Sequence, residues 1–219
     1  MTTVQIATLP ERESHLSLTV ASLIGQVDSM FVALNGHKEV PSFLLDNPKI
    51  SYLLMDNSLG DGAKFYNNDK LEGYILTCDD DLIYPQGYVG YMINGVKNHG
   101  GIVTILGKRY DERPIGSFGR GYTRLYSCLN EVRCDTEVHV AGTGVMAWHS
   151  DTIKIDPHSF SRKNMADVWV AKLAHEQGVK LTVLAHPRQY VVYNRFPWRI
   201  WNNDRDDTYQ TKVLNSFLK

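Results

Sequence analysis

The chain has 219 residues, of which 43% are hydrophobic and 21% charged, a composition typical of a folded soluble domain. This length suits one α/β domain, so we expect a single domain over residues 1–219. The formal net charge of −1 provides no broad basic surface, which argues against a nucleic-acid partner. No apolar run approaches the roughly 18 residues of a membrane span. The amino terminus also lacks the basic and apolar regions of a signal peptide.

Three cysteines are present, and none belongs to a C-x-x-C pair. An odd count without metal-ligand spacing indicates reduced thiols and no zinc site. Together with the missing signal peptide, this predicts a cytoplasmic protein.

In the first half of the chain, predicted strands and helices alternate. Apolar, strand-like runs occupy 4–9, 29–35, 50–56 and 73–78. Helices are expected after Pro10, over 59–71, and from Pro85 to about residue 98, since proline is well tolerated in a first helical turn. This alternation is typical of parallel β-α-β units.

The second half departs from that alternation. It predicts a strand over 100–108, a Gly- and Arg-rich loop over 109–136 and two short strands joined at Gly142-Thr143-Gly144. It then predicts a helix over 164–178, a strand over 179–186 and a helical tail over 203–219. We therefore expect an α/β fold whose central sheet is mixed but mostly parallel, with flanking helices.

Three consecutive aspartates, Asp79, Asp80 and Asp81, follow the strand-like run "YILTC". Ligands of open α/β sheets bind beyond the carboxyl ends of the strands, where this cluster is expected to lie. Side chains alternate along extended backbone, so Asp79 and Asp81 can face one side. Their oxygens suit Mg²⁺ or Mn²⁺. The ordinary alternative is a solvated acidic turn or a cap for the helix near Pro85.

The ordered series of motifs resembles the GT-A glycosyltransferases of family 2, enzymes that use nucleotide sugars. The matching features are the opening strand "VQIATLPER", the "GDGAKFY" turn, the D-x-D pattern of the aspartates, the "GTG" segment and the helix "NMADVWVAK". The whole also looks like the amino-terminal glycosyltransferase domain of a multidomain protein from a large algal virus, which would place it in the host cytoplasm. The resemblance implies a GT-A fold and transfer from a nucleoside-diphosphate sugar, such as a UDP-sugar, to a glycan or glycoprotein hydroxyl.

This resemblance also implies roles for individual residues. Metal ligands would be Asp79, Asp81 and His186. Donor contacts would come from Thr8, Leu9, Arg12, Asn35, Lys64, Asp79, Asp80, Gly142, Thr143 and Gly144. Each position has an ordinary alternative: Arg12 could pair with a neighbouring glutamate, Lys64 near Asp61 could be solvated, and Asn35 or the glycines could only form turns.

Asp167 is the catalytic candidate, because a half-buried carboxylate in an apolar first helical turn can accept the proton of an acceptor hydroxyl. In a retaining enzyme it would instead orient a substrate, and the alternative is an acid that complements the helix dipole. The commoner Glu-Asp pair of the family reads Ala166-Asp167 here. Acceptor contacts are expected at Trp198 and Arg199, although aromatic residues more often belong to the core.

Two other functions compete with a metal-dependent glycosyltransferase. An aspartyl-phosphate phosphotransferase or phosphatase also uses Asp-x-Asp after a strand, although that motif usually follows the first strand. A noncatalytic carbohydrate-binding domain could keep the fold without the activity, since fold does not establish function.

Overall fold

The computed structural model describes residues 1–194 and 207–219. The two expected acceptor contacts, Trp198 and Arg199, lie outside the described residues, as does the start of the expected helical tail. The described part contains no helix that is long and apolar enough to cross a membrane.

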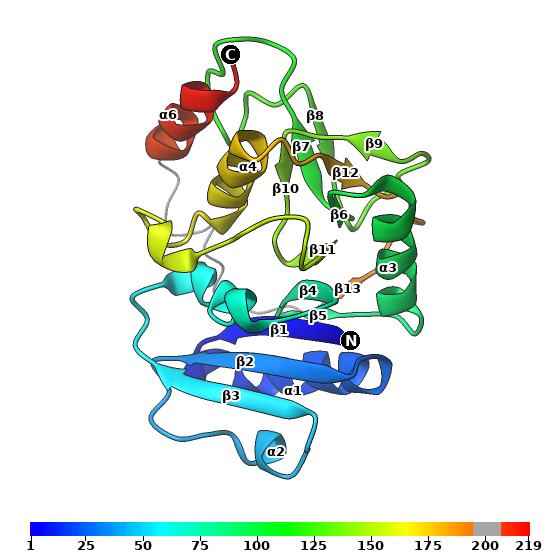
Figure 1. Ribbon diagram of the computed structural model, residues 1–219, viewed down its shortest axis with the longest axis vertical. Coiled ribbons are helices and arrows are strands. Elements are labelled where there is room, and N and C mark those ends of the chain that lie inside the picture. Colours follow the sequence, from blue (N-terminus) through cyan, green and yellow to red (C-terminus); the bar gives the residue numbers. More distant parts are fainter. Residues whose placement is uncertain (195–206) are drawn as a thin grey trace.

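A mixed sheet of eight strands forms the centre of the molecule, in the order β3-β2-β1-β4-β11-β6-β12-β9 (Figure 1). Neighbouring strands from β3 to β4 are parallel, and β11 runs antiparallel between β4 and β6. The strands are β1 (Thr2–Thr8), β2 (Ser29–Asn35), β3 (Ile50–Met55), β4 (Tyr74–Asp79), β6 (Ile102–Thr104), β9 (Thr136–Glu137), β11 (Val145–His149) and β12 (Leu181–Val183). The expected mixed, mostly parallel sheet is confirmed.

Two small sheets flank the main one. The first has the order β10-β7-β8 and the second pairs β13 with β5. Their strands are β5 (Leu82–Ile83), β7 (Gly107–Arg109), β8 (Arg124–Tyr126), β10 (Val140–Ala141) and β13 (Val192–Tyr193). Because β5 begins directly after the aspartate triplet, β13 brings the chain near residue 193 beside that triplet.

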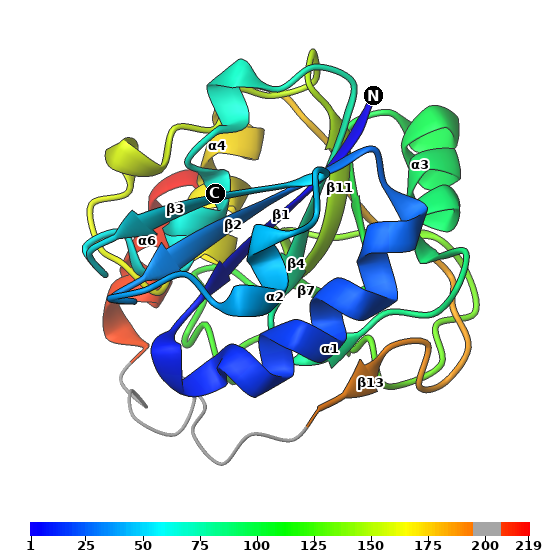
Figure 2. The same ribbon diagram turned by 90° about the horizontal axis from the view of Figure 1, so that it is seen from below.

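Helices cover both faces of the main sheet (Figures 1 and 2). They are α1 (Glu13–Leu23), α2 (Ser42–Leu45), α3 (Tyr88–His99), α4 (Ala166–Glu176) and α6 (Thr208–Phe217). Short 3₁₀ helices cover Pro10–Arg12, Ile24–Gln26, Gly60–Phe65, Asn68–Lys70 and Pro157–Ser159. We call Gly60–Phe65 the bridging turn, because its residues form hydrogen bonds with β2, β4 and α4.

The two faces of the sheet bury separate apolar clusters. Alternate residues of β1 such as Val4 and Ile6 pack with α1 and α3, whereas Ile75 and Trp148 on the opposite face pack with α4 and α6. This division follows from the two-residue period of a strand. Both faces are covered, which explains why the parallel strands read as continuous apolar runs.

Three sequence expectations need correction. Residues 59–71 form short 3₁₀ turns instead of one helix, which fits a glycine-rich segment with Gly60 at a φ of +56°. The strand expected over 100–108 is broken into β6 and β7. The loop expected over 109–136 contains β8, which doubles back to pair with β7.

Candidate active site

The carboxyl ends of β1, β2 and β4 meet at one edge of the sheet and open into a cavity of about 880 Å³. This is where ligands bind in open α/β sheets, and the volume lies near the upper end of the roughly 300–1,000 Å³ of small-molecule sites. The cavity also reaches the start of α4 and the first turn of α6, which pack against each other.

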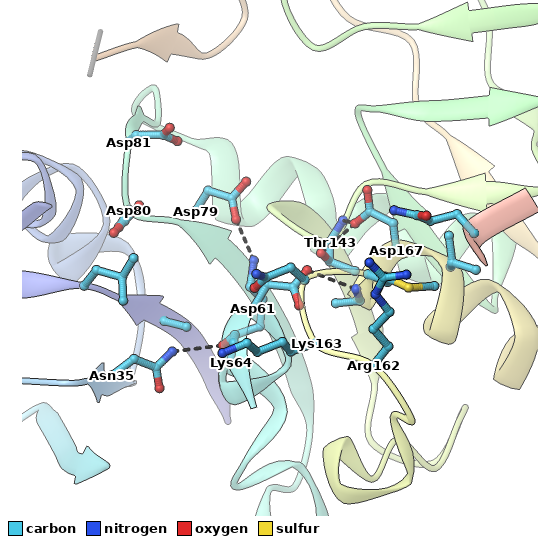
Figure 3. Close-up of a pocket in the computed structure, with 18 of the residues that line it drawn as sticks. Asn35, Asp61, Lys64, Asp79, Asp80, Asp81, Thr143, Arg162, Lys163 and Asp167 are labelled. Carbon is cyan, nitrogen blue, oxygen red and sulfur yellow. Dashed lines mark hydrogen bonds and ion pairs between the residues drawn. The ribbon is translucent and has the colours of Figure 1, made fainter. Parts of the chain in front are cut away.

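Asp79, the last residue of β4, forms an ion pair with a buried lysine. Its Oδ1 lies 2.5 Å from Nζ of Lys64, whose side chain is 5% exposed, whereas that of Asp79 is 44% exposed (Figure 3). Burial alone would lower the pKa of Lys64, but the carboxylates of Asp79 and Asp61 raise it above its ordinary value. Lys64 is therefore a fixed cation on the wall of the cavity, not a solvated surface lysine.

Asp80 lines the cavity, and both of its carboxylate oxygens are bound by residues that follow or end the first strand. Its Oδ2 accepts a hydrogen bond of 2.7 Å from Oγ1 of Thr8, and its Oδ1 lies 2.7 Å from Nη1 of Arg12. Arg12 is therefore held by the triplet. The contacts of Asp80 give it an anchoring role, and its contact with the donor stays a prediction.

Asp81 is a buried carboxylate whose negative charge is only weakly offset by nearby positive charge. Asp81 is 6% exposed, and Nη1 of Arg12 lies 3.5 Å from its Oδ2. Burial, together with the charges of Asp79 and Asp80, raises the pKa of Asp81 to about 7. A carboxylate in this position would gain from an added cation, because its own charge is poorly solvated.

Gly144 provides the space that the Asp79 carboxylate occupies. A Cβ atom on Gly144 would lie 1.9 Å from Oδ2 of Asp79. The carbonyl of Gly144 also accepts hydrogen bonds from the amide of Asp79, at 3.1 Å, and from the hydroxyl of Tyr84, at 2.6 Å. The glycine predicted to allow a close approach does so toward the acidic motif, and its contact with a sugar is untested.

We predict that Gly144→Ala pushes the Asp79 carboxylate out of place and weakens cation-dependent binding of UDP about tenfold or more. A displaced carboxylate no longer places its charge, or its oxygen atoms, where a bound cation needs them. Calorimetric titration of UDP with Mn²⁺ measures this effect. Gly25→Ala is the matched control, since a Cβ there meets nothing within 4 Å. Unchanged binding by a folded Gly144→Ala protein would contradict the assignment of Asp79.

Asp167 lies in the first turn of α4 and is held by the segment that precedes β11. Its Oδ1 accepts hydrogen bonds from the amide and the hydroxyl of Thr143, at 2.8 and 2.7 Å. Among the described residues, none donates a hydrogen bond to its second oxygen, and Asp167 lines the cavity opposite the triplet (Figure 3). The carboxylate is therefore oriented by one oxygen and can present the other to a substrate.

The bridging turn connects these parts of the site. Nδ2 of Asn35, at the end of β2, donates to the carbonyl of Gly60 at 2.9 Å. Oδ2 of Asp61 accepts a hydrogen bond of 3.0 Å from the amide of Ala166, the first residue of α4. Burial raises the pKa of Asp61 to about 6.

One wall of the cavity comes from the Arg-rich segment and α6. The amide of Phe118 donates to Oγ1 of Thr211 at 2.8 Å, and the amide of Gly119 donates to Oδ2 of Asp207 at 2.5 Å. Asn215 makes two further hydrogen bonds to the backbone of Ile115. The segment from 115 to 119 is thus fixed to the start and the last turns of α6.

Most of the predicted site residues line this one cavity. They are Thr8, Leu9, Arg12, Asn35, Lys64, Asp79, Asp80, Asp81, Thr143 and Asp167. The flanking glycines Gly142 and Gly144 do not line it; a Cβ on Gly142 would clash with the side chain of Leu106.

His186 does not belong to the cavity lining. It is 4% exposed, and its Nε2 and Nδ1 lie 3.0 and 3.1 Å from the carbonyl oxygens of Ile105 and Pro187. Each ring nitrogen thus has a backbone carbonyl within hydrogen-bond distance, and a neutral imidazole can donate to only one of them. The expected metal-ligand role of His186 stays a prediction, and its burial outside the cavity lining does not favour it.

Several lining residues were not among the sequence candidates. They are Ala7, Asn57, Gly60, Asp61, Phe118, Gly119, Arg120, Arg162, Lys163, Asn164, Met165, Ala166, Val168, Tyr193, Asp207 and Gln210. Residues 162–166 could have been found, since they lead into the helix that carries Asp167. Residues on α6 carried no comparable signal, because they reach the cavity only through tertiary packing.

The donor atoms at the triplet suit a cation that is shared with a ligand. Within the described ranges, no three histidine, cysteine or carboxylate side chains form a preformed metal cage. Mg²⁺ sites commonly need only one or two carboxylates, with water and substrate phosphates completing the shell. Asp79 and the under-compensated Asp81 fit that type of site.

Of the comparisons with known proteins, only the one with solved structures bears on the fold. No family model and no curated protein matches the sequence. Among solved structures, S. aureus TarS 1-349 in complex with UDP-GlcNAc is similar, with a TM-score of 0.61 and 14% sequence identity over 99% of this chain and 71% of that one. This likeness confirms the expected α/β fold with a mixed, mostly parallel sheet flanked by helices. Nothing in the comparisons supports a viral origin.

Proposed function

We propose that this protein transfers a sugar from a nucleoside-diphosphate sugar, with UDP as the nucleotide, to a hydroxyl of a glycan or glycoprotein acceptor. The observation that carries the proposal is the meeting of Asp79, Asp81 and Asp167 around one cavity at the carboxyl edge of the sheet. The similar fold of TarS, which was solved with UDP-GlcNAc, supports a UDP-sugar as the donor.

In this proposal the donor lies across the ends of β1, β2 and β4. Asn35 and the backbone around Thr8 and Leu9 line the end of the cavity where the nucleoside would sit. Arg12 and Lys64, each held by an aspartate, face the diphosphate. Because both side chains are already held in place, they lose little conformational entropy when they bind phosphate oxygens.

Asp79 and Asp81 would hold Mn²⁺ or Mg²⁺. When bound, such a cation offsets the negative charge that develops on the departing nucleoside diphosphate. Asp79 contributes an exposed carboxylate, whereas Asp81 contributes a buried one whose charge is poorly compensated.

Asp167 acts as the base in this account. Thr143 fixes one carboxylate oxygen of Asp167. The other carboxylate oxygen accepts the proton of the acceptor hydroxyl while the hydroxyl oxygen attacks the sugar and the nucleoside diphosphate departs. Positioning of this kind supplies much of the rate enhancement in transfer reactions. The acceptor would approach along the wall that contains Phe118, Arg120 and Gln210.

A thermal-shift screen tests the proposal. We expect UDP and its preferred UDP-sugar to raise the melting temperature by several degrees with Mn²⁺ present, because a ligand at 100 times its Kd adds about 2.7 kcal/mol, at about 2–4 °C per kcal/mol. Mn²⁺ alone and UDP with EDTA should produce much smaller shifts. No shift with any nucleotide, or equal shifts without the cation, would contradict the proposed donor site.

A further inference from the structure

The bridging turn makes three side-chain contacts with three different elements. Its carbonyl at Gly60 is held by Asn35 of β2, Asp61 reaches the first amide of α4, and Lys64 pairs with Asp79 of β4. Asp61 is separated from Ala166 by 105 positions in the sequence. One short turn therefore touches the donor side of the cavity and the helix that carries Asp167.

Asp61 has the position and chemistry of a helix cap supplied from a distant segment. The first amides of an α-helix lack partners within the helix. The residue that precedes α4, Met165, makes no side-chain cap, and Asp61 instead accepts the hydrogen bond of the Ala166 amide at 3.0 Å. Its negative charge also lies at the positive end of the helix dipole.

Asp61 is partly exposed as a residue, but one of its carboxylate oxygens is buried. Its Oδ1 is covered and has no hydrogen-bond partner among the described residues, and such an atom carries a desolvation cost. A neutral or apolar residue would avoid that cost. The neighbouring Lys64 is directed to Asp79 and leaves this oxygen unpaired. Retaining a carboxylate here makes sense where the amide of Ala166 must be held firmly.

We propose that Asp61 is a positioning residue, which fixes the first turn of α4 and thereby the Asp167 carboxylate relative to the donor. This inference rests on the proposed function. Asp167 is then held from two sides, by Thr143 through its own carboxylate and by Asp61 through the backbone of the preceding residue (Figure 3). Loss of either contact leaves donor binding intact but misplaces the base.

The activity test uses the UDP-sugar that the wild type turns over fastest among UDP-glucose, UDP-galactose and UDP-GlcNAc, with Mn²⁺ and release of UDP as the readout. Asp61→Ala should lower kcat about 10- to 100-fold, since a displacement of about 1 Å can have that effect, with the Kd of UDP unchanged. Asp61→Asn keeps an acceptor oxygen and should recover to within about fivefold of wild type. The exposed Asp69→Asn is the matched control.

The same substitution made in the Asp167→Asn protein distinguishes a positioning role of Asp61 from a general loss of structure. In Asp167→Asn protein, Asp61→Ala should lower the remaining rate by less than about threefold, because residues that act through one group are not additive. A further loss equal to that seen in the wild type would overturn the proposal. So would an Asp61→Ala protein that keeps its full kcat.

Hydrogen exchange tests the same contact without any turnover. Amides at the start of α4, residues 166–170, should exchange faster in Asp61→Ala than in the wild type and in Asp61→Asn. Equal protection in all three proteins would overturn the positioning role. If no UDP-sugar bound or turned over while the exchange difference appeared, the proposed function would fail and the structural contact would stand.

Discussion

Asp167→Asn should lower the rate of sugar transfer about 100- to 10,000-fold, the range that a general base contributes, while the Kd of UDP with Mn²⁺ changes by less than about twofold. Asparagine keeps the shape of the side chain and can still accept the hydrogen bonds from Thr143. It cannot take a proton from the acceptor hydroxyl. The loss should therefore appear in kcat and not in donor binding.

Transfer to a panel of methyl glycosides, with calorimetry of UDP binding, measures both quantities for Asp167→Asn. Asp151→Asn is a suitable control, because that aspartate is exposed and does not line the cavity. A variant with near wild-type kcat would remove Asp167 from the chemistry. A variant that lost donor affinity instead would assign Asp167 to orientation of the donor sugar.

Asp81→Asn should reduce Mn²⁺-dependent UDP binding by at least about 100-fold, since even residues that only support a metal ligand contribute about 10- to 100-fold. The same change should stabilise the protein without a cation. In the folded state the pKa of Asp81 is about 7, against an ordinary 3.8. The folded state therefore holds more protons than the unfolded state between these values, and stability falls as the pH rises through that window.

At pH 8 the Asp81 carboxylate is charged in the folded state, so the full cost of burying that charge is present. The neutral amide of asparagine avoids this cost. Removing a poorly compensated buried charge is worth on the order of 1–3 kcal/mol, so the melting temperature should rise by about 2–4 °C per kcal/mol. Thermal melting scans at pH 8 and pH 5, with and without Mn²⁺ and UDP, measure both the gain in stability and the loss of cation-dependent binding. A variant that is less stable without the cation, or that still gains stability from Mn²⁺ and UDP, would contradict the role of Asp81.

The first half of the chain could be predicted well from its residues. The run 30–34 is apolar throughout because both faces of the sheet are covered there, and Asp79 is the last residue of β4. The site elements β1, β2 and β4 are parallel neighbours, so polar residues at their ends were bound to meet. Thr8, Asn35 and the aspartate triplet are therefore found together without any knowledge of distant contacts.

The contacts that complete the site could not be predicted in the same way. Asp61 meets Ala166, and Asp207 meets Ser117 and Gly119, across about 90 to 105 positions of sequence. Such pairings depend on how α4 and α6 pack, which no local pattern determines. The sequence could not show that His186 lies beside two backbone carbonyls and outside the cavity lining, because these contacts also depend on tertiary packing.

Diffraction at the manganese absorption edge, from crystals soaked with Mn²⁺ and UDP, tests the central claim most directly. This account predicts an anomalous peak within bonding distance of carboxylate oxygens of Asp79 and Asp81, on the side that faces the diphosphate. Bound UDP with no such peak, and with both carboxylates in contact only with water or Lys64, would contradict it.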